Sequence, residues 1–145
     1  ESDGLYLASY QTGSTALQMF VKTSTNVQNW SAPARDFAVS GNNHDSLPIV
    51  MPDDAFVIFW IREAGGQFDI AARRSLDGVA WQPAVAVTAT PTENDVEPHP
   101  LTGESPGVDA PYWGREIPLG STIYNIVRDP SVVVRDSVYA SGFDN

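Results

Sequence analysis

The sequence repeats itself with a period of about 51 residues, and this constrains its fold more than any other feature. Residues 24–30 (Ser-Thr-Asn-Val-Gln-Asn-Trp) align without a gap with residues 75–81 (Ser-Leu-Asp-Gly-Val-Ala-Trp). Asp-x-x-Pro recurs at 45–48 and 95–98, and an aromatic-Trp-x-Arg-Glu element recurs at 59–63 and 112–116. A fixed period of this length indicates one repeated supersecondary unit. The 145 residues hold about 2.8 copies of it.

Each unit is expected to consist of four short antiparallel strands. Residues 55–61 are β-branched, aromatic and apolar on both faces, which is typical of a strand buried on both sides. The strands expected around it are 47–51, 68–74 and 83–88. No window of 11–18 residues has helical periodicity. Four strands in about fifty residues, repeated along the chain, are typical of β-propeller blades.

We therefore predict an all-β protein built from blades of four antiparallel strands, about 2.8 blades in one domain. The blades are expected at approximately 1–40, 41–90 and 91–145. The first lacks its opening strand and begins at Leu5–Tyr10, and the third is expected to use 98–102, 110–115, 122–128 and 132–136. Since known propellers have 4–8 blades, the domain is expected to be partial or completed by an oligomer. The expected partner is a second copy or the remainder of a larger propeller, with 138–143 able to complete a neighbour's sheet.

The motif Ser75-x-Asp77-Gly78-x-x-Trp81 resembles the Asp-box, or BNR repeat, of sialidase-like β-propellers. The resemblance covers about residues 45–88 well, 5–38 moderately and only the first half of the third unit. The first copy of the box departs from the pattern, because Asn26 replaces Asp and Val27 replaces Gly. Short boxes of this type also occur in five-bladed arabinanase-like glycosidases, so the branch of the superfamily stays open.

The residue types of the box indicate a structural role. Asp accepts hydrogen bonds from backbone N–H groups of a tight turn, and Ser adds a hydroxyl. Gly permits a left-handed backbone, and Trp is expected to plug the space between blades. We therefore interpret seven residues as structural: Ser24, Asn26, Trp30, Ser75, Asp77, Gly78 and Trp81.

The candidate ligand site is expected at the end of the sheets away from the box. Successive connections in an antiparallel meander alternate between its two ends, and the resemblance places the family's binding or active site at that opposite end. Arg donates to carboxylates and sugar hydroxyls, Trp can stack on a sugar ring, and glycoside hydrolysis needs paired carboxylates. The ligand-binding candidates are Trp60, Arg62, Glu63, Trp113, Arg115, Glu116, Asp45 and Asp95. The same residues fit turn salt bridges and packing, and their repetition favours that reading.

The resemblance implies a carbohydrate-recognising protein, either part of a sialidase-like glycoside hydrolase or a glycan-binding module. A non-catalytic structural or interaction scaffold of an extracellular assembly is the alternative. No catalytic residue is assigned, because the arginine-rich opening motif of sialidases is absent. Whether the chain is an enzyme therefore stays open, and if it is one, we expect a glycosidase.

Charge and composition limit the other partners. The net charge of −10 disfavours nucleic acid. No apolar run approaches the roughly 18 residues of a membrane span. The chain has no cysteine, and its acidic, lysine-poor composition fits a secreted, cell-surface or periplasmic protein. We expect no metal or other cofactor; Ca²⁺ is the one candidate, at Glu93-Asn94-Asp95 or Asp53-Asp54, without EF-hand spacing.

Overall fold

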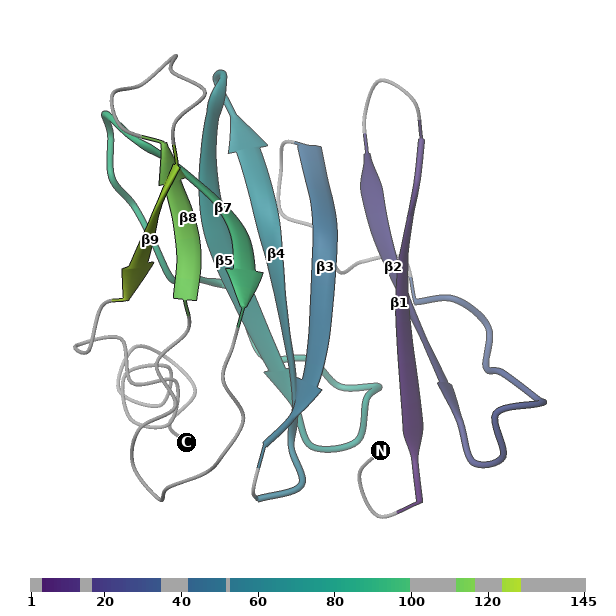
Figure 1. The fold of residues 1–145 in the computed structure, drawn as a ribbon. Helices are drawn as coiled ribbons and strands as arrows, with labels where there is room; N and C mark the ends of the chain where they lie inside the picture. The colour runs from purple at the N-terminus through teal and green to yellow at the C-terminus, as the bar shows by residue number, and fades with distance from the viewer. Residues whose placement is uncertain are drawn as a thin grey trace.

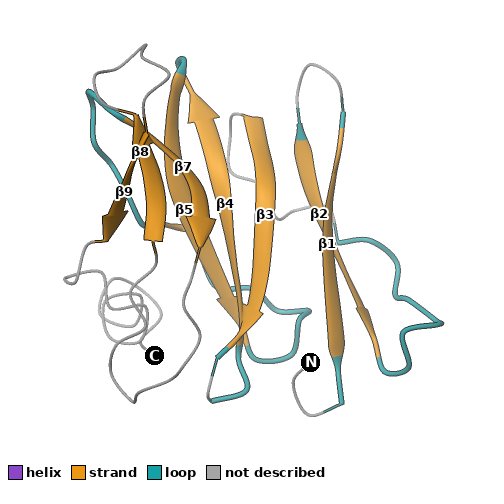
Figure 2. Cartoon of the chain, in the orientation of Figure 1, coloured by secondary structure: helices purple, strands orange, loops and turns teal. Residues whose placement is uncertain are grey.

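The structure is a computed structural model, and it describes residues 4–13, 17–34, 42–51, 53–99, 112–116 and 124–128. Within these residues the chain is all β, with nine strands, antiparallel pairing throughout and no helix. The strands form three sheets that lie side by side (Figures 1 and 2). The all-β prediction is confirmed for this part of the chain.

The three sheets contain two, four and three described strands. The first sheet pairs β1 (Tyr6–Thr12) with β2 (Gln18–Ser24). The middle sheet has the order β3 (Asn42–Val50), β4 (Phe56–Ala64), β5 (Gln67–Ser75) and β6 (Val85–Ala86). The third has the order β7 (Asn94–His99), β8 (Tyr112–Glu116) and β9 (Tyr124–Arg128). The middle sheet is thus the predicted four-stranded meander.

The opening strands of the middle and third sheets begin earlier than the sequence pattern predicted. Expected at 47–51 and 98–102, β3 and β7 instead start at Asn42 and Asn94. Their first halves are rich in Asn and Asp, which are poor strand formers, so the sequence of these residues did not indicate a strand. Both strands stand at the edge of their sheets, where a proline such as Pro48 is tolerated. The expected segments 132–136 and 138–143 lie outside the described residues.

A β-bulge interrupts each opening strand and determines which residues are equivalent. The register shifts between His44 and Leu47 in β3, and between Val96 and His99 in β7. Asp45 and Glu97 have positive φ angles of 52° and 54° at these bulges. The structural counterpart of Asp45 is therefore Glu97, whereas the sequence alignment had matched Asp45 with Asp95.

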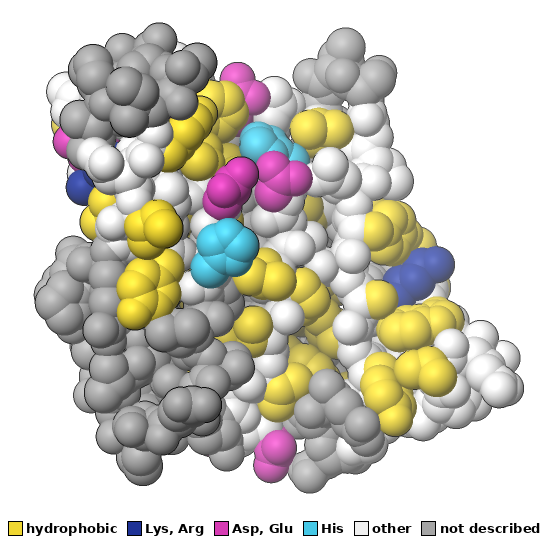
Figure 3. All heavy atoms as spheres, viewed as in Figure 1, with side chains coloured by type: hydrophobic (Ala, Val, Ile, Leu, Met, Phe, Trp, Pro, Cys, Tyr) yellow, Lys and Arg dark blue, Asp and Glu magenta, His cyan; other side chains and the backbone are white. Residues whose placement is uncertain are grey.

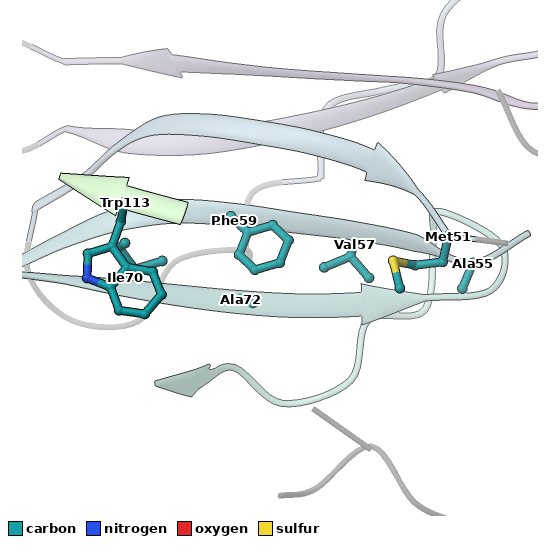
Figure 4. Packing of buried hydrophobic residues seen from close by; sticks show 7 residues of the cluster. All are labelled: Met51, Ala55, Val57, Phe59, Ile70, Ala72 and Trp113. Atoms are coloured by element: carbon teal, nitrogen blue, oxygen red, sulfur yellow. The ribbon is translucent and has the colours of Figure 1, made fainter. Parts of the chain in front are cut away.

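Two hydrophobic clusters hold the sheets together. Alternate residues of β4 point to opposite faces of the middle sheet: one set packs toward the first sheet, the other toward the third. The first cluster consists of Met19, Val21, Ile58, Trp60 and Ala71. The second consists of Met51, Ala55, Val57, Phe59, Ile70, Ala72 and Trp113 (Figure 4). Each large side chain buried in this way contributes about 1.5–3 kcal/mol to stability.

The two repeated turns, which follow β2 and β5, have the same hydrogen-bond network. In the second turn, Asp77 Oδ1 accepts hydrogen bonds from the N–H groups of Val79 (2.8 Å) and Ala80 (2.7 Å) and from the Ser75 hydroxyl (3.0 Å). The indole Nε1 of Trp81 donates to the Gly78 carbonyl at 3.2 Å. The side chain of Asp77 therefore organises the turn.

The first turn reproduces this network with Asn26 in place of the aspartate. Asn26 Oδ1 accepts from the N–H groups of Gln28 (3.0 Å) and Asn29 (2.8 Å) and from the Ser24 hydroxyl (3.3 Å). Trp30 Nε1 donates to the Val27 carbonyl at 3.2 Å. An amide oxygen can accept these bonds as a carboxylate does, so the network survives the departure from the sequence pattern.

The surroundings of the two turns differ. Gly78 has a φ of 68° and packs so closely that a Cβ there would lie 2.7 Å from Thr23 Cγ2 of the first sheet. Trp81 is partly buried against the first cluster. Trp30 was expected to plug the space between two blades, but it is 37% exposed. The reason is that its turn extends from the outermost sheet, which has no described neighbour on that side.

Candidate functional site

The ends of the strands form two opposite edges of the molecule, which are distinct from the edge strands of each sheet. The repeated turns lie at the lower edge of the sheets in Figure 1, which we call the turn edge. The connection from β4 to β5 through Gly65 and Gly66, and the start of β7, lie at the upper edge. We call this second edge the polar edge, because four polar residues lie there at or next to the ends of their strands: Asn42, Glu63, Asn94 and Glu116.

Asparagine side chains at the polar edge fasten each sheet to the one before it. Asn42 Oδ1 accepts a hydrogen bond from the Leu17 N–H of the first sheet (3.3 Å), and its Nδ2 donates to Glu63 (2.8 Å). We call this arrangement an asparagine clamp. It joins the start of β3 both to the preceding sheet and to the next strand of its own sheet.

A second asparagine clamp repeats the geometry between the middle and third sheets. Asn94 Oδ1 accepts from the Phe68 N–H (3.0 Å), and its Nδ2 donates to Glu116 (2.5 Å). Glu63 and Glu116, both predicted as ligand contacts, are thus equivalent residues that serve equivalent clamps. The clamps themselves were missed from sequence, although a regular spacing of Asn to Glu, 21 and 22 residues apart, could have revealed them.

Arg115 and Asp95 form a buried ion pair beside the second clamp. The Asp95 side chain is fully buried and accepts hydrogen bonds from Arg115 Nε (2.7 Å) and Nη2 (3.2 Å). Thr90 donates its hydroxyl to the same carboxylate at 2.9 Å, and Arg115 Nη1 also contacts Glu93 at 3.0 Å. The carboxylates of Asp95 and Glu93 therefore already bind the guanidinium group on both sides.

The two predicted stacking residues, Trp60 and Trp113, lie in the core. Trp60 is 0% exposed and its Nε1 donates to Asn43 Oδ1 at 2.8 Å. Trp113 is 2% exposed and packs in the second cluster, with the Arg115 guanidinium 5.8 Å from its ring. Their rings therefore pack against neighbouring sheets and present no open face for a sugar. Asp45 differs from them, because it is exposed and lies 2.9 Å from His44 Nδ1.

Arg62, the remaining candidate, lines a small pocket together with Asp69 and Thr88. The pocket has a volume of about 130 Å³ and lies between the ends of β4 and β5 and the segment 84–89. Arg62 and Asp69 are paired across the β4–β5 ladder, so their side chains share one face. The rest of the wall is made mainly of small side chains from 84–89 and Ala71. Polar groups therefore gather at one side of a mostly apolar hollow.

Asp69 has unusual electrostatics. Burial raises the pKa of its carboxyl above the ordinary value of 3.8, and the negative charge of Asp95 raises it further. Hydrogen bonds from Thr90 and Thr88 and the charge of Arg62 oppose this shift. The buried Oδ1 atom accepts no hydrogen bond. Sequence reasoning did not single out Asp69, because one Asp in a strand carries no motif.

The polar edge is acidic overall. Arg62 and Arg115 are its described basic side chains, and both face carboxylates. The described acidic side chains that end or flank its strands are Asp45, Glu63, Asp69, Glu93, Asp95, Glu97 and Glu116. Among the described residues, no group of three His, Asp or Glu side chains is arranged to hold a metal ion. Nor does the described part of the chain contain a helix that is long and apolar enough to span a membrane.

Comparison with known proteins adds no family assignment. No protein-family model matches the sequence, and no curated protein matches it. The arguments about function therefore depend on the repeated turns, the asparagine clamps and the pocket at Arg62 and Asp69.

Proposed function

We propose that the three sheets are blades of an Asp-box β-propeller and that the polar edge recognises a neutral carbohydrate. The first and middle sheets each have a turn in which Asn26 or Asp77 accepts the same set of hydrogen bonds, and this supports the first part, since a box repeated in successive sheets is the pattern of that superfamily. In that superfamily the edge opposite the box carries the ligand site. The same reasoning makes a secreted or cell-surface location the expectation.

The pocket at Arg62, Asp69 and Thr88 carries the carbohydrate proposal. A guanidinium, a carboxyl and a hydroxyl beside an apolar wall provide the donors and acceptors that a sugar ring needs, next to a surface for its C–H face. The carboxyl of Asp69 lines the pocket, so it can accept a hydrogen bond from a ligand that carries a donor there. We infer that a sugar hydroxyl is this donor.

A neutral sugar is favoured over a sialic acid by charge. Sialic acids carry a carboxylate, and Arg115 is already bound to Asp95 and Glu93. Arg62 faces Asp69, across the β4–β5 ladder. The carboxylate of a sialic acid that entered this edge would be repelled by these acidic side chains, and no described cation is free to offset the repulsion.

Glycoside hydrolysis is the second candidate function, and the raised pKa of Asp69 is the observation that favours it. A carboxyl whose pKa is raised above its ordinary value keeps its proton to higher pH, and in this form it can serve as a general acid toward a glycosidic oxygen. A non-catalytic scaffold is the third, favoured by the structural contacts of Glu63, Glu116, Asp95 and Arg115.

The proposal is tested by titrating a matched pair of oligosaccharides, with and without terminal sialic acid, against the chain by calorimetry. We expect the neutral member to bind more tightly, and Arg62→Ala to weaken it at least tenfold, since one hydrogen bond to a charged group contributes about 1.5–3 kcal/mol. Leu76→Ser, at an exposed position of the turn edge, is the matched control and should bind as the wild type does. Preference for the sialylated member contradicts the proposal. Absence of binding in folded protein favours the scaffold.

Hydrolysis is tested separately with neutral nitrophenyl glycosides. Activity that is lost in Asp69→Asn, while binding is kept, assigns Asp69 the role of the acid. Binding without turnover in the wild type assigns the site to recognition alone.

A further inference from the structure

The outer face of the third sheet has no neighbouring sheet among the described residues. A groove of about 440 Å³ runs across it, lined by Glu97, His99, Tyr112, Tyr124 and Ile126 among others. Ile126 is 83% exposed and Tyr124 is 52% exposed. Hydrophobic side chains are visible on the surface over β7 to β9 (Figure 3). Contiguous exposed apolar surface of this kind is typical of an interaction site.

The ladder registers identify what the face corresponds to. Phe59 pairs with Ala72 and Ile61 with Ile70 in the middle sheet, whereas Tyr112 pairs with Arg128 and Gly114 with Ile126 in the third. Ile126 is therefore the counterpart of Ile70, and by the same alignment Tyr112 is the counterpart of Phe59.

In the middle sheet the equivalent face is completely covered. Phe59 and Ile70 are fully buried, and Trp113 of the third sheet packs against them (Figure 4). The groove lies where a further sheet would pack if the stack continued beyond the third sheet. It is therefore shaped for a sheet that presents an aromatic side chain where the third sheet presents Trp113.

The first sheet presents such a side chain on its own uncovered face. Tyr10 pairs with Phe20 in its ladder, as Trp60 pairs with Ala71 and Trp113 with Val127. It is 36% exposed and stacks on Phe20 with the ring centroids 5.5 Å apart. Figure 3 shows hydrophobic side chains with a basic side chain beside them over β1 and β2.

The two uncovered faces are complementary in charge as well. Lys22, the single lysine of the chain, lies with its Nζ 5.6 Å from the centre of the Tyr10 ring. The opposite face carries the exposed Glu97, and the chain as a whole is strongly acidic. A basic group on one end face and an acidic group on the other favour head-to-tail contact over contact between like faces.

We propose that two copies of this chain associate head to tail, with Tyr10 of one copy seated in the Tyr112–Ile126 groove of the other. Two copies supply six sheets, within the 4–8 sheets of closed propellers. A two-fold axis then relates two equal contacts, so both exposed faces of each copy are covered and no face remains for further growth.

The mass of the 145-residue chain in solution, measured by light scattering after gel filtration, is the first test. We expect twice the chain mass of 15.7 kDa. Ile126→Glu and Tyr10→Glu, both at exposed positions, should each return the mass to that of one chain at the same concentration. A single-chain mass for the wild type, larger open assemblies, or a dimer that neither variant weakens would overturn the proposal.

Mixing the two variants separates head-to-tail contact from a symmetric dimer. A mixed pair keeps one contact with both faces intact, so Ile126→Glu and Tyr10→Glu together should form dimers more readily than either alone. A dimer of like faces predicts no such rescue, and that result would overturn the proposal.

Engineered cysteines test the contact directly, since the chain has none of its own. Oxidising Tyr10→Cys mixed with Ile126→Cys should give a cross-linked heterodimer. Leu76→Cys mixed with Ile126→Cys is the control for random collision, because Leu76 is also exposed but lies on the turn edge. Equal yields in the two mixtures would overturn the assigned contact.

Discussion

Arg115 donates two hydrogen bonds to the fully buried carboxylate of Asp95, from Nε at 2.7 Å and from Nη2 at 3.2 Å. Asn43, which pairs with Arg62 in the middle sheet, holds the position equivalent to Asp95 and accepts a hydrogen bond from Trp60 instead. The ion pair is therefore specific to the third sheet, although Arg62 and Arg115 recur in sequence. Its role can be tested through stability.

Arg115→Ala should destabilise the fold by about 3–5 kcal/mol, because it leaves a buried carboxylate without its partner. Urea unfolding at pH 7 measures the difference in the free energy of unfolding. Arg62→Ala is the comparison variant and should cost less, since it borders a pocket rather than a fully buried charge. A loss below 1 kcal/mol for Arg115→Ala would contradict the role of Arg115 as the essential partner of the buried Asp95 carboxylate.

Asp77→Ala should cost about 1 kcal/mol, as the loss of a side-chain cap does, whereas Asp77→Asn should cost less, because it loses only the advantage that the negative charge gives at neutral pH. Asn26 already performs the same task in the first turn through an amide oxygen. The backbone hydrogen bonds from Val79 and Ala80 lower the pKa of Asp77 below 3.8.

The lowered pKa of Asp77 gives a pH dependence with a definite sign. Its contribution to stability is present above pH 3.8 and is lost as the pH falls through the lower, folded-state pKa. The wild type should therefore lose its advantage over Asp77→Asn in acid. Urea midpoints measured from pH 6 to pH 2 check this, and parallel curves would refute the cause assigned to the shift.

Gly78→Ala and Val27→Gly should act in opposite directions at equivalent positions. Gly78 has a φ of 68° and no room for a Cβ against Thr23, so the alanine should cost about 2 kcal/mol. Val27 has a φ of 55° in an exposed turn, and glycine should relieve strain for a net gain of about 0.5–1 kcal/mol. Thermal unfolding of both variants measures the contrast; a drop in the melting temperature of Val27→Gly would contradict it.

Asp69→Asn should stabilise the fold more at pH 7 than at pH 3.5. Burial raises the folded-state pKa of Asp69 above 3.8, so the folded state binds more protons than the unfolded state between the two pKa values. The contribution of Asp69 is therefore complete below pH 3.8 and declines as the pH rises through the raised value. The difference in urea midpoint between wild type and variant, followed against pH, checks the sign.

Much of this fold could be predicted from the repeats. The all-β class, the middle meander and the positions of the two turns follow from buried β-branched runs and from Ser, Asx and Trp at fixed intervals. The starts of β3 and β7 could not be predicted, because Asn42 and Asn94 form strands through contacts with the preceding sheet rather than through propensity. Local sequence does not report a contact with a residue 25 positions away.

The candidate site was predictable as a location but not in its chemistry. Alternation of the connections predicted that Arg62 and Arg115 lie at the edge opposite the repeated turns, and the structure has them near the ends of β4 and β8 at that edge. Their partners decide their roles, and the equivalent positions hold Asn43 in one sheet and Asp95 in the other. The pocket arises where Asp69, an ordinary strand residue, meets Thr88 from a later segment. Such a meeting is visible only in three dimensions.

The asparagine clamps imply that each sheet could be moved as a cassette. Polar contact at the junction uses backbone N–H groups on one side, which every sequence except proline offers, and one amide side chain on the other. Residues 42–93 could therefore be duplicated and the copy inserted before Asn94, and the added unit would carry its own asparagine clamp. A molecule of this kind can thus grow by the addition of whole sheets, without redesign of the contacts between them.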